Sequence, residues 1–181
     1  VGISITADRY LENGRNVFGS FSYYTSKLSP TTNNTRIKDP ETSLMTIAAG
    51  YKITLTDKWA LAGVARLQED TFFNQVNSTT VALTKAMIKM VGAVPEYTFY
   101  NSGKLAMGVG VGGYLLLPTD VPNSTTTSMG TLFEVDAKAS YKVGWGRLTG
   151  GMAYGSRSQK NDVYSYNSAD VAYRLGLLYL F

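Results

Sequence analysis

Residues 129–143 read MGTLFEVDAKASYKV, and this stretch decides the fold. From Phe133 onward an apolar or small residue occupies every second position, while the positions between carry Glu134, Asp136 and Lys138. Successive side chains of a β-strand point to opposite faces, so the stretch predicts a strand with one apolar and one ionic face. A helix would need a period of 3.6 residues, which is absent here.

The same alternation runs outward from this stretch through most of the chain. Residues 45–55, 59–67 and 105–115 place apolar side chains at odd positions, with small, polar or charged ones between them. Counted back from the C-terminus, the pattern predicts eight strands, most of which reach the roughly 9–11 residues that cross a bilayer at a tilt. Their expected ranges are 17–27, 43–55, 59–72, 81–100, 104–117, 129–143, 147–157 and 168–181.

The predicted links between strands alternate in length. Residues 56–58, 101–103 and 144–146 have the composition of tight turns. Longer polar links are expected around residues 29–41, 74–80, 118–128 and 157–167. Short periplasmic turns with longer outer loops are typical of bacterial membrane barrels, so we expect an all-β, closed antiparallel transmembrane β-barrel over residues 15–181.

The first residues fit this scheme badly. Residues 1–12 also alternate and precede an Asn13-Gly14 turn, but a ninth strand would break the even count usual for bacterial barrels. We therefore expect residues 1–14 to form a strand-like N-terminal extension that lies in or across the lumen.

Composition narrows the possible functions. The 181 residues include no Cys and no His, which excludes disulfides, thiolate metal sites and the usual catalytic base. The net charge of +4 comes from scattered Lys and Arg without a basic run, so nucleic acid is not an expected partner. We expect no cofactor, no bound metal and no enzymatic activity.

A soluble β-sandwich or lipocalin-like barrel also has alternating strands, and it would turn its apolar face inward. Aromatic residues near the predicted turns favour lipid outside instead, because such residues form belts at membrane interfaces. The expected interface aromatics are Tyr51, Trp59, Tyr97, Phe99, Tyr141 and Trp145.

Charged residues on the other face predict a lumen filled by ion pairs, because buried charges persist only when they are paired. Glu134 and Asp136 lie about 7 Å apart on one strand face, and we favour a structural role for them over a catalytic pair. Lys85 and Lys89 are expected to point inward, with a bulge near Pro95 that restores the outward aromatics. The expected lumen network is Lys52, Arg66, Glu134, Asp136, Lys138, Arg147 and Arg174.

The end of the chain carries a more specific pattern. Tyr173, Leu175, Leu177 and Tyr179 alternate up to a terminal Phe181. This pattern resembles the C-terminal assembly signal of Gram-negative outer-membrane proteins. Over roughly residues 17–181 the chain also resembles, in its architecture, the small eight-stranded barrels of the OmpA transmembrane-domain and OmpX type. The resemblance implies a bacterial outer-membrane location, contact with lipid and lipopolysaccharide, insertion by the barrel-assembly machinery, and a monomer. Outer-membrane proteases and lipid A-modifying enzymes of similar fold rely on histidine, which this chain lacks.

Three functions stay open from the sequence. The first is a non-enzymatic anchor with a packed lumen and exposed loops that recognise a surface partner. The second is a narrow passage for ions, small solutes or small apolar molecules, with Phe18, Tyr24, Tyr114 and Leu116 as candidates for an apolar funnel. The third is adhesion through the loops.

Overall fold

The structure is a computed structural model that describes residues 2–27, 36–38, 41–75, 80–122, 126–144, 146–160 and 165–179. Long strands dominate these ranges, as the alternation predicts. In the same ranges, no helix combines the length and hydropathy that a membrane crossing requires. The strands are β1 (Gly2–Tyr10), β2 (Arg15–Lys27), β3 (Arg36–Lys38), β4 (Glu41–Thr54), β5 (Trp59–Gln75), β6 (Thr80–Asn101), β7 (Leu105–Leu116), β8 (Gly130–Val143), β9 (Gly146–Lys160) and β10 (Ser165–Tyr179).

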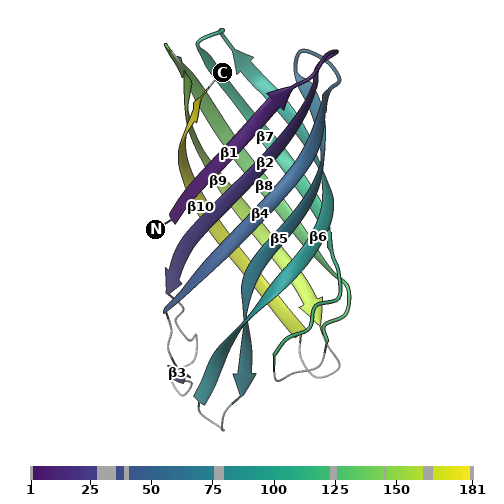
Figure 1. Cartoon of the computed structure of the whole chain (residues 1–181), viewed down its shortest axis with the longest axis vertical. Coiled ribbons are helices and arrows are strands. Elements are labelled where there is room, and N and C mark those ends of the chain that lie inside the picture. Colours follow the sequence, from purple (N-terminus) through teal and green to yellow (C-terminus); the bar gives the residue numbers. More distant parts are fainter. Residues whose placement is uncertain are drawn as a thin grey trace.

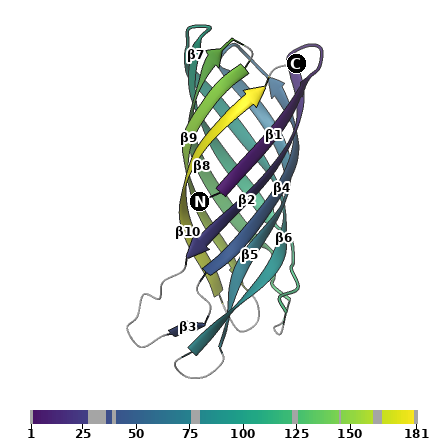
Figure 2. The ribbon, with the colours of Figure 1, turned by 60° about the vertical axis from the view of Figure 1, so that its left-hand side comes forward.

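Nine of these strands form one continuous antiparallel path in the order β1-β2-β4-β5-β6-β7-β8-β9-β10. The short β3 pairs in parallel with β6, off this path. The tilted strands curl around a long axis, and the edge strands β1 and β10 come into contact (Figures 1 and 2). Within the described residues no backbone ladder joins β1 to β10. The all-β antiparallel prediction is confirmed, and the curled sheet is barrel-like.

The sheet has nine strands along its path, not the eight expected, because residues 2–10 form a hairpin with β2. The chain reverses at Asn13 and Gly14, whose φ values of 61° and 69° lie in the left-handed region that a tight Asn-Gly turn needs. Residues 2–10 therefore pair along the wall, where a separate extension across the lumen was expected. The odd count makes β1 and β10 run in the same direction.

The two ends of the sheet differ in their links (Figure 1). At the turn end, short links join neighbouring strands at residues 11–14, 55–58, 102–104 and 144–145. At the loop end, the links are residues 28–40, 76–79, 117–129 and 161–164. Two of the predicted long links are shorter than expected, because β5 continues to Gln75 and β9 to Lys160.

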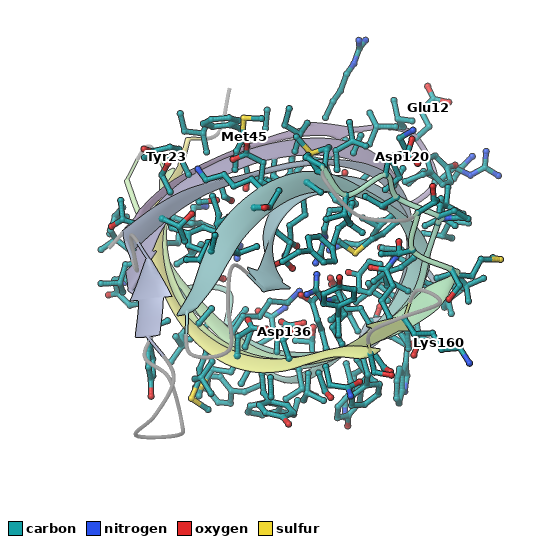
Figure 3. All side chains as sticks on the ribbon, turned by 90° about the horizontal axis from the view of Figure 1, so that it is seen from below. Glu12, Tyr23, Met45, Asp120, Asp136 and Lys160 are labelled. Carbon is teal, nitrogen blue, oxygen red and sulfur yellow. The ribbon has the colours of Figure 1, made fainter. Side chains whose placement is uncertain are left out.

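Apolar side chains cover the outer face of the sheet, and ionisable side chains turn into the lumen. On β8, Phe133, Val135 and Tyr141 are exposed, whereas the side chain of Glu134 between them is only 20% exposed. The view along the axis shows Asp136 inside the ring of strands and Tyr23 outside it (Figure 3). A soluble barrel has the opposite arrangement.

The expectation for Lys85 and Lys89 is wrong: both side chains are exposed, and their neighbours Ala86, Ile88 and Met90 are buried in the lumen. No bulge occurs at Pro95. It keeps its register with β5, and the residues on either side of it keep one register with β7. The register with β7 shifts only between Thr98 and Tyr100. With the alternation unbroken through Pro95, the lysines must lie on the outer face.

Candidate functional site

The candidate site is the lumen, where side chains from opposite walls meet. Arg66 of β5 donates from Nη1 and Nη2 to the two carboxylate oxygens of Glu134 on β8, each at 2.8 Å. Arg66 Nη2 also donates to the Tyr114 hydroxyl at 2.8 Å, and the guanidinium carbon lies 4.4 Å from the centroid of that ring. Two strands separate β5 from β8 in the sheet, so this two-pronged pair ties the walls together across the interior.

A second ion cluster lies nearer the turn end. Glu96 of β6 accepts from Lys52 Nζ at 3.0 Å on one oxygen and from Lys138 Nζ at 2.8 Å on the other. The side chain of Glu96 is 18% exposed, and both of its oxygens have a cationic partner. One carboxylate therefore links β4, β6 and β8.

A third pair lies toward the loop end. Arg157 of β9 pairs with Asp70 of β5, and the backbone N–H of Thr71 donates to the same carboxylate at 2.7 Å. The Arg157 guanidinium also lies 5.5 Å from the centroid of Phe72. Because the Arg157 side chain is 6% exposed, this charge is removed from water and depends on its partner.

An apolar layer fills the lumen at the loop end. Phe72 of β5 and Tyr166 of β10 meet edge-to-face across the interior, with ring centroids 4.7 Å apart and planes at 84°. Such a contact contributes to stability beyond simple burial. We call this set the apolar layer; its members are Phe72, Ala86, Ile88, Met90, Tyr114, Leu116, Val121, Leu132 and Tyr166.

The link between β7 and β8 closes over the apolar layer. Its Val121 is 3% exposed and packs within the layer. Thr119 and Thr127 hold the link together, since the backbone N–H of Thr127 donates to the Thr119 carbonyl at 2.9 Å. The buried Gln159 of β9 donates to Thr127 Oγ1 at 2.8 Å. The described residues of this link, 117–122 and 126–129, are therefore held to the wall by hydrogen bonds, with one valine pointing into the lumen.

Glycines make room for these interior side chains. A Cβ at Gly112 would lie 2.7 Å from Cε2 of Tyr114, and one at Gly92 would lie 2.5 Å from the Gly113 carbonyl oxygen and overlap the same ring. The tyrosine ring thus lies flat on a wall that has no side chains at these positions. At Gly110 the space is taken by the carboxylate of Asp136.

The expected lumen residues fall into three groups. Lys52, Arg66, Glu134 and Lys138 take part in the ion pairs described above. Asp136 lies inside over Gly110, without an ion pair to a described residue, and Arg147 donates to Ser140 Oγ at 3.2 Å. The side chain of Arg174 lies outside the described residues. Across the described ranges, no group of three acidic residues is placed to hold a metal ion.

Of the apolar layer, sequence reasoning named only Tyr114 and Leu116, and it left two acidic partners out of the expected lumen network. Glu96 and Asp70 both fall on inward positions of the alternation, and this signal was sufficient to find them. The partner of Asp70 was harder to identify, because Arg157 stood at the predicted end of its strand. The buried Ala86, Ile88 and Met90 were missed because Lys85 and Lys89 were expected to point inward, which placed these three residues on the outer face.

The expected interface aromatics that the structure describes lie on the outer face or at its margin. Trp59 and Tyr97 form a tilted pair with ring centroids 4.7 Å apart, and Tyr51, Phe99 and Tyr141 are exposed. Trp145 lies outside the described residues. Of the expected assembly signal, Tyr173 and Leu175 are 80% and 91% exposed. The backbones of Leu177 and Tyr179 pair with β9, and Phe181 lies outside the described residues.

Comparisons with known proteins give little further support for any particular function. No protein-family model matches the chain, and no curated protein matches its sequence. Among solved structures, the chain is similar to the FrpB iron transporter from Neisseria meningitidis (F3-3 variant), with a TM-score of 0.44 and 12% sequence identity. The match covers 98% of this chain and 35% of the other, so this chain spans about a third of the transporter's length. A likeness at this level carries no argument about what this chain does.

Proposed function

We propose that the chain is an integral, non-enzymatic protein of a bacterial outer membrane, whose wall crosses the bilayer and whose lumen is closed by its own side chains. It would serve as an anchor that presents the loop-end segments to a surface partner. One observation carries the proposal: apolar side chains face outward, while the ion pairs face inward. On β5 the outward apolar band runs from Trp59 to Leu67, close to the length of a bilayer-crossing strand.

The contacts across the lumen support an interior that is closed by side chains. Eight-stranded barrels have an interior that side chains just fill, and here three ion clusters and the apolar layer occupy successive levels of a slightly wider sheet. Each level bridges strands that are not neighbours in the sheet. Water and ions would have to displace paired charges in order to pass, which favours an anchor over a channel.

The test combines membrane insertion with planar-bilayer recording. The protein refolded into vesicles should float with them, migrate differently on gels before and after heating, and give no stable conductance steps. Steady steps that change in an Arg66→Met variant would replace the anchor with a narrow channel. Failure to float would refute the membrane-spanning proposal itself.

A second candidate function is favoured by the apolar layer, which includes Tyr114 and Leu116 of the apolar funnel expected from the sequence. A passage for small apolar molecules would use this layer after Val121 and its link move away. Methyl NMR separates the two candidates, because Met90 lies in the lumen whereas Met107 and Met152 lie on the outer face. With n-decanol added to the protein in micelles, a shift of the Met90 methyl would favour the passage. Shifts confined to Met107 and Met152 would support the closed lumen.

A further inference from the structure

Two lysines of β6 lie at the loop-end margin of the outer apolar face. Lys85 and Lys89 are both exposed and point away from the lumen. Lys89 lies directly opposite Leu67, the last outward apolar residue of β5 before Glu69. Both lysines therefore lie at the loop-end limit of the apolar band on β5 and β6.

The surroundings of the two lysines are polar and include one acidic side chain, that of Glu69. Lys85 Nζ donates to Ser43 Oγ at 3.1 Å and to the Ser43 carbonyl oxygen, reaching over β5 to β4. The side chain of Lys89 is exposed and makes no hydrogen bond or ion pair with another residue that the structure describes. Glu69 lies opposite Met87, between the lysines, and forms no ion pair in the described part of the chain. We call Ser43, Glu69, Lys85 and Lys89 the rim patch.

The rim patch differs from the part of this margin that β8, β9 and β10 form. On β8, β9 and β10, the outward positions that follow the apolar band at the loop end are uncharged, namely Thr131, Ser156 and Asn167. Lys160 lies further out, at the tip of β9. Among these described strands, positive charge next to the apolar band is therefore concentrated on β6.

We propose that the rim patch binds the phosphate group of an anionic lipid in the leaflet at the loop end. The inference rests on the proposed function, in which the outer face contacts lipid. An ammonium group is a compact charge that suits a phosphate, and a lysine is tolerated on the lipid side only near the headgroups. The acyl chains would then lie on Leu67 and Val91, which are 42% and 46% exposed on the apolar band just below.

The test counts the lipids that the full chain retains. The protein is placed in nanodiscs of equimolar phosphatidylglycerol and phosphatidylcholine and released into a mass spectrometer under native conditions. The wild type should retain phosphatidylglycerol in preference. Replacing Lys85→Gln and Lys89→Gln should weaken that retention about fivefold per lysine. The matched control, Lys58→Gln with Lys104→Gln, removes two exposed lysines at the turn end and should leave retention unchanged.

Each contrary result has its own meaning. Equal retention of the two lipids by the wild type, or equal losses in both double variants, would overturn the rim patch as a site. Displacement of the lipid by millimolar inorganic phosphate would show a free-phosphate site instead. A chain that enters no nanodisc and shows no heat-dependent migration would refute the membrane-spanning function, and the lipid site with it.

Discussion

Among single residues, Gly92 is a position of the lumen wall that has no room for a larger side chain. A Cβ there would meet both the Tyr114 ring and the backbone of Gly113, neither of which can move freely. Gly92→Ala is expected to lower the free energy of unfolding by about 1–3 kcal/mol, as overpacking does. Gly63→Ala is the control, because its Cβ would meet nothing within 4 Å, and its effect should stay within about 0.5 kcal/mol. Urea titration in micelles measures both, and equal effects would contradict the close packing.

The Arg66–Glu134 pair gives a second prediction for single residues. Arg66→Met leaves the carboxylate buried without its partner and should cost about 3 kcal/mol of unfolding free energy. Adding Glu134→Leu should recover part of that loss, so a double-mutant cycle in micelles should show coupling of about 1 kcal/mol or more. Arg147→Met is the control, because Arg147 contacts Ser140 without an ion pair in the described ranges. Strict additivity of the two changes would mean that the pair contributes nothing to stability.

At the scale of elements, β1 is an edge strand that buries little of its surface. Its residues 4–10 are exposed on both faces, whereas alternate residues of β7 are buried from Gly108 to Leu116. Amide exchange in micelles should therefore be at least about tenfold faster in β1 than in β7, because opening β1 exposes little buried surface. Equal protection of the two strands would show that β1 is held by contacts as firm as those of the interior strands.

The strands also show how far the sequence predicts this structure. Period-two alternation located the β8 strand and its inward acids without help, because every second residue there is apolar. It failed on β6, where Met87 on one face and Ile88 and Met90 on the other are equally apolar. The free-energy cost of an outward lysine is about 2–4 kcal/mol at the bilayer midplane and falls to about 0–1 kcal/mol near the headgroups. The alternation does not predict how deep in the bilayer a residue lies, so it could not show that these lysines are tolerated outside. Contacts across the lumen, such as Asp70 with Arg157, depend on how the sheet curls and could not be predicted either.

At the scale of the whole molecule, the outer face fixes how the chain would sit in a bilayer. Trp59, at the turn end of β5, should lie near one interface, about the thickness of the hydrocarbon core away from Lys89. In a Trp145→Phe variant, which leaves Trp59 as the sole tryptophan, lipids brominated near the headgroup should quench fluorescence more than lipids brominated at the chain ends. Stronger quenching from the chain ends would place Trp59 in mid-bilayer and contradict this depth.

The hairpin at Asn13 and Gly14 adds a strand and so affects the diameter of the proposed barrel. In the proposed closed barrel, a ninth strand would enlarge the circumference by about one eighth relative to eight strands, because barrel diameter grows roughly in proportion to strand number. Side chains that just fill the lumen of an eight-stranded barrel would leave a gap in the wider lumen of a nine-stranded barrel. The rings of Phe72 and Tyr166 and the inserted Val121 supply that missing bulk. In such a barrel, the wall widened by the one strand β1 would be matched by a cluster of apolar side chains in an interior that is otherwise lined with charge.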